Sequence, residues 1–323
     1  MSFLKQKKIL VTGGAGFIGH KLVALLNQKI KDCEIHVSDL LNTQVQNVGP
    51  EAARGDFRNL QGIGFNKIFI GDLADPDFVQ GLLGNEYDVI FHLGAISDTT
   101  FTDQRRLMRV NLESFQFFLD WVAKSGSTLV YASSAAVYGN KTGTLELGNE
   151  SPLNPYGVSK YLVDKLVQKH IGQKREGRVV GLRYFNVYGP GEEFKYETAS
   201  VAYQLACSIL SGKLPTLFDD SASTFRDFVF IDDVLEANIL ASENGVSGIY
   251  NVGSGTARTF VDVFNLVKGS LKYDGPINWT PNHVSGYQKY TVADLSRTRK
   301  ELGFSPKFNL ENGIGKYLDQ LRK

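Results

Sequence analysis

The stretch Thr12-Gly13-Gly14-Ala15-Gly16-Phe17-Ile18-Gly19 directly follows the apolar run Ile9-Leu10-Val11. This run is short and β-branched at both ends, which is typical of a buried parallel strand. The glycines at 13, 16 and 19 let the backbone turn tightly, approach a pyrophosphate closely and pack a following helix, expected over Phe17–Asn27, on the sheet. The free N–H groups and positive dipole end of that helix would face the phosphates.

A second strand, expected over Glu34–Ser38, ends at Asp39, twenty residues after Gly19. A dinucleotide-binding fold places there the carboxylate that meets the adenosine ribose. A glycine cluster alone fits an ordinary tight turn equally well. The preceding strand and Asp39 together favour the dinucleotide site.

Composition excludes several classes of protein. The chain has 323 residues, 42% of them hydrophobic and 21% charged, and a net charge of +1. These values are typical of a globular protein and give no reason to expect a nucleic-acid partner. The two cysteines show no CxxC spacing and the five histidines no metal-ligand spacing, so we expect no metal site and a reducing compartment. No run approaches the ~20 apolar residues of a membrane span, and we expect a cytoplasmic protein without a membrane partner.

Further strand-like runs alternate with helical patterns, which indicates βαβ units. The sequence therefore predicts an α/β fold with a Rossmann-type, doubly wound parallel sheet and a smaller C-terminal α/β substrate lobe. We expect the dinucleotide-binding domain over 1–185 and mainly the lobe over 186–323, with the chain crossing back to the sheet. Asn251–Gly255 is interpreted as a glycine turn, and 42–64 as a long polar connection. The expected strands are Lys67–Ile70, Asp88–His92, Thr128–Tyr131 and Val179–Arg183.

Tyr156 and Lys160 lie four residues apart at the start of an expected helix, which places both side chains on one helix face. A neighbouring ammonium favours the tyrosinate and lowers the pKa of a phenol, so Tyr156 could accept an alcohol proton as hydride leaves. Ser134, just past the strand Thr128–Tyr131, supplies a hydroxyl. Alone, a Tyr and a Lys at this spacing are commonplace, and Ser134 also fits a turn or a helix cap.

The glycine stretch, Asp39, Asp72-Leu73, Ser134 and the Tyr156–Lys160 pair occur in the order and spacing of the extended short-chain dehydrogenase/reductase family. Nearly the whole chain resembles this family. The resemblance implies a bound nicotinamide dinucleotide and a C-terminal lobe for a nucleotide-linked sugar. It places the following residues at the cofactor: Gly13, Gly16, Phe17, Ile18, Gly19, Asp39, Leu40, Asp72, Leu73, Leu93, Gly94, Ala95, Ser97, Asn111, Tyr156, Lys160, Val187 and Lys195.

The second half is most similar to the ADP-glycero-manno-heptose 6-epimerases, a branch of this family that makes lipopolysaccharide core precursors. The sharper marker is Lys195 ahead of Thr198-Ala199-Ser200, because a lysine here is the second acid/base of that branch. On charge pattern alone it would be a solvated lysine beside Glu192 and Glu193. The resemblance implies these substrate-binding residues: Ser134, Asn186, Glu197, Gln204, Phe218, Asp219, Asp220, Ser221, Arg226 and Tyr287.

Some positions depart from the pattern of the branch. Gly191 stands where an arginine is common, Glu197 and Gln204 stand where a serine and a histidine touch substrate, and Asp219-Asp220-Ser221 replaces a Glu-Gly-Ser loop. These departures leave the exact sugar open. The principal alternative is another nucleotide-sugar enzyme such as a UDP-hexose 4-epimerase. A 4,6-dehydratase is disfavoured because Ala135-Ala136 stands where that branch has Asp-Glu.

From a different functional class, a redox-sensing regulator could bind a dinucleotide without turnover. The intact Ser134, Tyr156 and Lys160 argue against it, since a sensor has no need of them. For the cofactor, Asp39 by itself favours NAD because it would repel a 2′-phosphate. The epimerase branch nonetheless holds NADP beside a similar acid, so NADP is the predicted cofactor and NAD the alternative. Relatives often assemble, and we expect a homo-oligomer.

Overall fold

The glycine stretch joins the first strand to the first helix, as predicted, in a computed structural model that describes residues 3–30, 32–41, 55–141, 143–244, 246–283 and 287–322. Part of the expected polar connection, residues 42–54, lies outside these ranges. The central sheet has seven parallel strands in the order β11-β7-β5-β4-β1-β2-β3. They are β1 (Lys8–Thr12), β2 (Glu34–Asp39), β3 (Lys67–Ile70), β4 (Val89–His92), β5 (Thr128–Ser134), β7 (Arg178–Tyr184) and β11 (Gly248–Val252).

The strand order reverses at β1, because β2 pairs with one of its edges and β4 with the other. In open parallel sheets, ligands bind beyond the carboxyl ends of the strands at such a switch point. The glycine stretch that leaves β1 lies at this point. The fold class expected from the sequence, a doubly wound parallel sheet, is confirmed.

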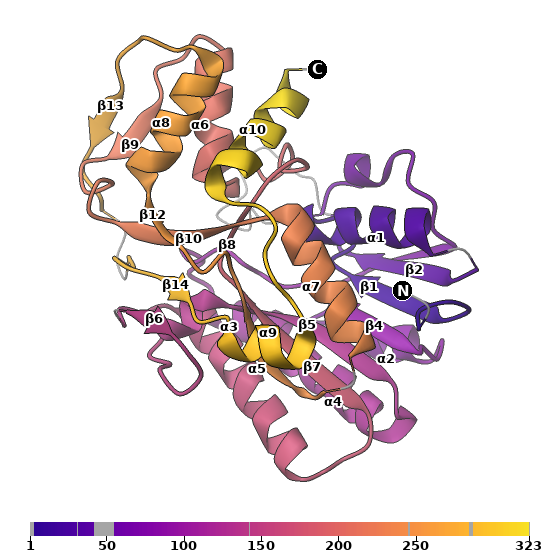
Figure 1. Cartoon of the computed structure of the whole chain (residues 1–323). Helices are drawn as coiled ribbons and strands as arrows, with labels where there is room; N and C mark the ends of the chain where they lie inside the picture. The colour runs from indigo at the N-terminus through magenta and orange to yellow at the C-terminus, as the bar shows by residue number, and fades with distance from the viewer. Residues whose placement is uncertain are drawn as a thin grey trace.

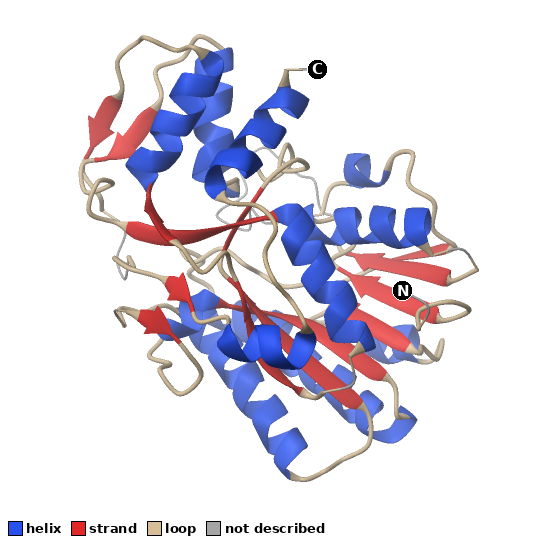
Figure 2. Cartoon of the chain, viewed as in Figure 1, coloured by secondary structure: helices blue, strands red, loops and turns tan. Residues whose placement is uncertain are grey.

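Helices cover both faces of the sheet (Figures 1 and 2). Side chains alternate between two cores, since Ile9 and Val11 pack in one and Leu10 packs in the other. The first core receives α1 (Phe17–Lys29) and α7 (Ile231–Glu243). The second receives α2 (Pro76–Leu83), α4 (Ser114–Ser125) and α5 (Pro155–Gly172).

The smaller lobe lies over the carboxyl edge of the sheet (Figure 1). It has a three-stranded sheet, β12-β10-β8, a pair β13-β9, and three helices. A further pair, β14-β6, lies beside it (Figure 1). The elements are β8 (Asn186–Tyr188), β10 (Phe225–Phe230), β12 (Ala257–Thr259), β9 (Thr216–Phe218), β13 (Asn278–Thr280), β6 (Thr144–Leu145), β14 (Val292–Ala293), α6 (Val201–Leu210), α8 (Phe260–Leu271) and α10 (Leu310–Leu321).

The chain returns from the lobe to the sheet through α7 and β11 before it builds α8. The interpretation of Asn251–Gly255 as a turn is wrong for Asn251 and Val252, which pair with Arg183 and Tyr184 as part of β11. The predicted end of β5 at Tyr131 is also too early, since that strand runs on to Ser134. The remaining short elements are α3 (Gln104–Met108), α9 (Ser296–Leu302), three 3₁₀ turns at Phe57–Leu60, Ala135–Tyr138 and Tyr196–Thr198, and a π-helical turn at Arg109–Glu113.

Candidate active site

A cavity of about 600 Å³ opens at the carboxyl ends of the central strands and is bounded on its other side by the lobe. Most of the residues that the sequence assigns to the site line it. From the sheet and its loops these are Gly13, Gly16, Phe17, Ile18, Gly19, Asp39, Leu40, Asp72, Leu73, Leu93, Gly94, Ala95, Ser97, Ser134, Tyr156 and Lys160. From the lobe and its connections they are Asn186, Val187, Lys195, Arg226 and Tyr287.

The glycine stretch brings bare backbone to this cavity. Gly13 has φ of +65°, and a Cβ there would lie 2.7 Å from the backbone nitrogen of Gly94. A Cβ at Gly19 would lie 2.0 Å from the carbonyl oxygen of Gly13, so close packing requires glycine at both positions. Gly16 is the N-cap of α1 and provides no side-chain cap, which leaves the first N–H groups of the helix for a ligand. This cradle fits the pyrophosphate of a dinucleotide.

Asp39 ends β2 beside the same stretch. Its carboxylate accepts hydrogen bonds from the backbone N–H of Ala15 at 2.9 Å and of Leu41 at 3.1 Å. Burial raises the pKa of this carboxyl above its usual value, and these N–H groups oppose that shift. Asp39 therefore fixes the shape of the glycine stretch and also lines the cavity.

Tyr156 and Lys160 face the cavity from the first turns of α5. The helix begins at Pro155, because the side chain of Asn154 accepts the N–H of Gly157 and because proline is favourable in the first turn. Burial raises the pKa of Tyr156, and a hydrogen bond with Ser134 opposes this rise. Burial lowers the pKa of Lys160 to about 8, against the attraction of Asp164. The expected lowering of the tyrosine pKa by the ammonium is therefore not found; burial sets the direction of the shift, and the group that opposes it is Ser134.

Behind Lys160 lies a buried ionic network. Asp164, one turn further along α5, accepts hydrogen bonds from Tyr131 at 2.7 Å and from Ser133 at 3.0 Å. The fully buried Arg183 donates to Asp164 at 2.8 Å and to Glu150 at 2.7 Å. Each buried charge therefore has a partner, as burial requires. The network anchors α5 to β5 and β7 below the Tyr156–Lys160 pair.

Lys195 reaches the cavity from the connection between β8 and α6. Its Nζ lies 5.0 Å from the centre of the Phe17 ring, at the start of α1, and 3.7 Å from Oε2 of Glu192. Its side chain is 27% exposed, so the solvated position expected from charge pattern alone is not what the structure shows. Lys195 and Tyr156 thus line one cavity from different elements, the connection before α6 and the helix α5.

Arg226 presents a buried cation at the lobe side of the cavity. Its guanidinium lies 4.9 Å from the centre of the Tyr287 ring and 5.6 Å from that of Phe260. Burial lowers its pKa below the usual value for arginine. A cation held between aromatic rings suits an anionic phosphate group beside a flat base.

Several predicted site residues lie outside the lining of this cavity. Asn111 is buried behind the cavity wall. Its side-chain oxygen accepts the N–H of Ile96, and its amide nitrogen donates to the carbonyl of Ile96 and to the hydroxyl of Ser159. Gln204 donates to the carbonyls of Glu197 and Ala199, so it closes the loop before α6. Glu197 lies in the turn Tyr196–Thr198, and the remaining predicted residues in this group lie around the end of β9: Phe218, Asp219, Asp220 and Ser221.

The loop after β9 is held by contacts of its own. Asp220 binds Lys289 and Asn282, and Phe218 packs edge-on against Tyr287 with ring centres 6.1 Å apart. Asp219 is exposed, whereas Ser221 is buried. This loop therefore supports the cavity wall through Tyr287.

Arg106 and Gln288 are among the lining residues that were not predicted from the sequence. Arg106, on α3, forms an ion pair with Asp72 at 2.6 Å where the resemblance places the adenine. Gln288 donates to the carbonyl of Gly139 at 2.8 Å and lines the cavity beside Tyr287. An arginine in a short helix far along the chain from Asp72 carries no motif, so only its contact reveals it. Gln288 directly follows Tyr287, which the resemblance places at the substrate.

Residues 9–253 match the model of the NAD dependent epimerase/dehydratase family. The chain belongs to this family. It is also 38% identical, over 98% of both chains, to ADP-L-glycero-D-manno-heptose-6-epimerase of Brachyspira hyodysenteriae. The family and the epimerase-type enzyme expected from the sequence are therefore confirmed.

Solved structures agree with this assignment. The crystal structure of ADP-L-glycero-D-manno-heptose-6-epimerase from Helicobacter pylori is similar at 35% identity and a TM-score of 0.88, over 99% of this chain and 97% of that one. The UDP-glucose 4-epimerase of Thermotoga maritima, solved with UDP-glucose, is similar at 26% identity and a TM-score of 0.86, over 98% of both chains.

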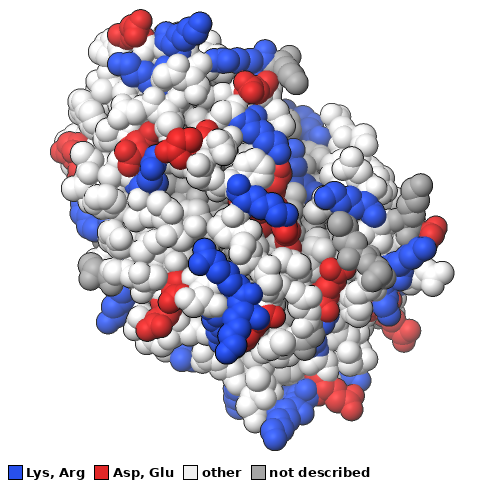
Figure 3. Space-filling view, viewed as in Figure 1, with Lys and Arg blue, Asp and Glu red and all other residues white. Residues whose placement is uncertain are grey.

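Acidic and basic side chains are interspersed on the face shown in Figure 3, in keeping with the net charge of +1. Across the described ranges, none of the helices has the length and apolar character to span a bilayer.

Proposed function

We propose that this protein inverts C6 of the heptose in ADP-glycero-manno-heptose by transient oxidation and re-reduction. The observation that carries the proposal is that Tyr156 and Lys195, whose side chains can each donate or accept a proton, line one cavity from different elements. The full-length similarity to heptose 6-epimerases supports the same substrate.

An epimerase must remove a hydride from one face of the carbon and return it to the other. A bound nicotinamide supplies the hydride acceptor and then the hydride donor. Because that partner is fixed, the substrate presents two orientations, and each needs an acid/base within about 3 Å of the oxygen at C6. In one orientation Tyr156 accepts the hydroxyl proton as the ketone forms, with Ser134 hydrogen-bonded to its phenol. In the other, Lys195 returns a proton to that oxygen as the C–H bond forms again.

The cofactor we propose is NADP. Both oxygens of Asp39 are engaged by backbone N–H groups, and burial raises the pKa of this carboxyl, so its repulsion of a 2′-phosphate is reduced. Lys160 would hold the nicotinamide ribose from α5. Arg226 would bind the diphosphate of the sugar nucleotide, with Tyr287 beside it.

Turnover with defined substrates tests the proposal. The purified protein, incubated with ADP-D-glycero-manno-heptose, should convert the C6 configuration, followed by NMR. Lys195→Met should keep fold and cofactor but slow epimerisation by about 10² or more, the scale of one lost acid/base, and Tyr156→Phe should do the same. The double variant should be slower than either.

A hexose 4-epimerase is the second candidate, favoured by the similarity to the Thermotoga maritima enzyme. A ring 4-epimerase can work with one acid/base, because its ketone intermediate turns past a single tyrosine. Conversion of UDP-glucose, with Lys195→Met still active and the heptose untouched, would establish this second function instead.

A further inference from the structure

Lys195 is carried by a loop that one buried carboxylate holds together. The loop runs from the end of β8 to Ser200, the N-cap of α6. Glu192, three residues before Lys195, has a side chain with 0% exposure. Its Oε1 accepts hydrogen bonds from the N–H of Gly189 at 3.0 Å and from the hydroxyl of Ser200 at 2.8 Å. Its Oε2 accepts the N–H of Ser200 at 2.5 Å.

The same carboxylate reaches two further groups. The hydroxyl of Tyr317, on α10, donates to Oε1 at 3.4 Å. The ammonium of Lys195 lies 3.7 Å from Oε2, and the N–H of Lys195 donates to the carbonyl of Glu192 at 2.9 Å. Within the described ranges, Lys195 is the one cation paired with this buried charge. Because a buried carboxylate is costly without a countercharge, it attracts the Lys195 ammonium toward Oε2.

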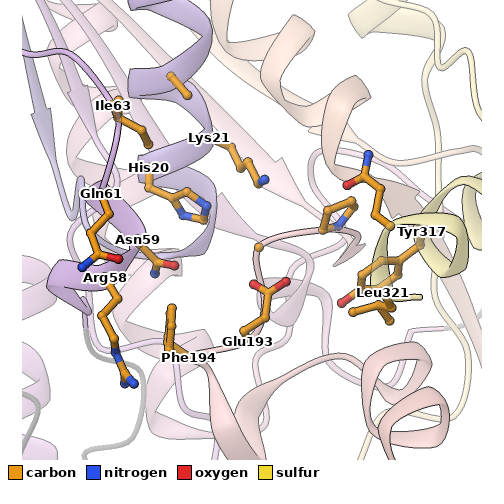
Figure 4. Close-up of a pocket in the computed structure, with 14 residues that line it drawn as sticks. His20, Lys21, Arg58, Asn59, Gln61, Ile63, Glu193, Phe194, Tyr317 and Leu321 are labelled. Atoms are coloured by element: carbon orange, nitrogen blue, oxygen red, sulfur yellow. The ribbon is translucent and has the colours of Figure 1, made fainter. Parts of the chain in front are cut away.

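The next residue, Glu193, lies in a different environment from Glu192. Its side chain lines a different cavity of about 500 Å³, between α1, the turn at Phe57–Leu60 and α10 (Figure 4). Phe194 points into that cavity as well, where the guanidinium of Arg58 lies 3.9 Å from its ring centre. Adjacent acidic residues thus face two different environments, and only Glu192 contacts the lysine of the catalytic cavity.

We infer that Glu192 is a positioning residue that holds the Lys195 ammonium in the catalytic cavity. A lysine has four rotatable bonds, and without a partner its ammonium would move freely between cavity and solvent. The ion pair restricts that freedom while the hydrogen bonds fix the loop to α6 and α10. Small misplacements of a reacting group lower rates strongly, so the position of Nζ should govern kcat. This inference rests on the proposed role of Lys195.

The test compares kcat, KM and cofactor affinity in matched variants of the full-length protein with ADP-D-glycero-manno-heptose. Glu192→Gln should lower kcat about tenfold or more and change KM and cofactor Kd less than twofold. Glu193→Gln should leave all three unchanged. Tyr317→Phe removes one hydrogen bond to Glu192 but keeps the charge, so it should lower Tm and leave kcat within twofold.

The Lys195→Met background separates positioning from general support of the fold. There, Glu192→Gln should cause no further loss of kcat, because its effect passes through the missing ammonium. If Glu192→Gln does not fold by circular dichroism, Glu192→Asp is used in both backgrounds, with a several-fold loss expected only when Lys195 is present. Equal losses in both backgrounds, or a kcat equal to that of Glu193→Gln, would overturn the inference. Normal activity of Lys195→Met would instead overturn the proposed function.

Discussion

Lys160 is a buried lysine with a shifted pKa, so its environment can be measured through the pH dependence of stability. Its pKa is about 8 in the folded protein against a usual value of 10.5. Between about pH 8 and pH 10.5, Lys160 is protonated in the unfolded chain but not in the folded chain. The contribution of Lys160 to the free energy of unfolding therefore rises with pH across this range. The shift corresponds to about 3 kcal/mol.

We therefore expect the unfolding free energy of the parent, minus that of Lys160→Met, to increase by about 3 kcal/mol from pH 8 to pH 10.5. Urea unfolding of the cofactor-free proteins at a series of pH values measures this difference, and subtraction removes the other titrating groups. A flat difference would mean that the Lys160 ammonium is solvated in the folded protein.

Arg106 tests a site residue that only the structure reveals. Its ion pair with Asp72 closes the cavity where the adenine is proposed to lie. Arg106→Leu should raise the cofactor Kd about three- to tenfold, the range of one partly exposed charge contact, and leave kcat at saturation unchanged. Fluorescence titration measures the Kd. The neighbouring Arg105, which is exposed, supplies the matched control Arg105→Leu, and equal Kd values for both variants would remove Arg106 from the site.

At the scale of elements, a side chain at Gly16 and one at Gly19 should have different effects. A side chain at Gly19 would collide with backbone, whereas one at Gly16 would meet only the carbonyl oxygen of Gly13, at 3.2 Å, and would project toward the cavity. Gly16 also has extended φ and ψ values of −78° and 176°, which valine adopts readily. The two substitutions should therefore separate binding from folding.

We expect Gly16→Val to fold with a near-normal Tm and to retain no cofactor, measured by absorbance of the supernatant after denaturation. Gly19→Val should lose several kcal/mol of stability, because the helix must move away from the strand turn. Circular dichroism melting curves of both variants make the comparison. Normal cofactor content in folded Gly16→Val would show that the glycine stretch does not hold a pyrophosphate.

The sequence predicted elements well where local pattern and fold agree. The apolar runs at Ile9–Val11, Asp88–His92 and Thr128–Tyr131 each became a buried strand of the sheet, because parallel strands covered on both faces are continuously apolar. The end of β11 was misread because Asn251, Gly253 and Gly255 resemble a turn, while the pairing of this strand with β7 depends on a segment more than sixty residues earlier. The short strands of the lobe have the same difficulty, since three residues carry no periodicity.

The site could be predicted to a similar degree. Motif residues such as Tyr156 and Asp39 were located because their spacing expresses a local geometry. Glu192 and Arg106 were not, because their importance comes from contacts to Lys195 and Asp72 that no local spacing encodes. Asn111 was assigned to the cofactor, yet its amide is satisfied by the Ile96 backbone and Ser159, a structural role that only the fold discloses.

On the scale of the whole molecule, the sheet and the lobe share the walls of the cavity, and a ligand that touches both should stabilise them as one unit. A ligand bound only by the folded protein adds about 2.7 kcal/mol at 100 times its Kd. We expect NADP to raise Tm of the nucleotide-free protein by several degrees and NAD to do so less at the same concentration. Thermal melts with each dinucleotide measure this, and Gly16→Val should respond to neither. A larger shift with NAD would make NAD the cofactor, with Asp39 acting as a free carboxylate toward the ribose hydroxyl. Absence of any shift would leave the cavity without its proposed dinucleotide, since linkage requires a bound ligand to stabilise the form that binds it.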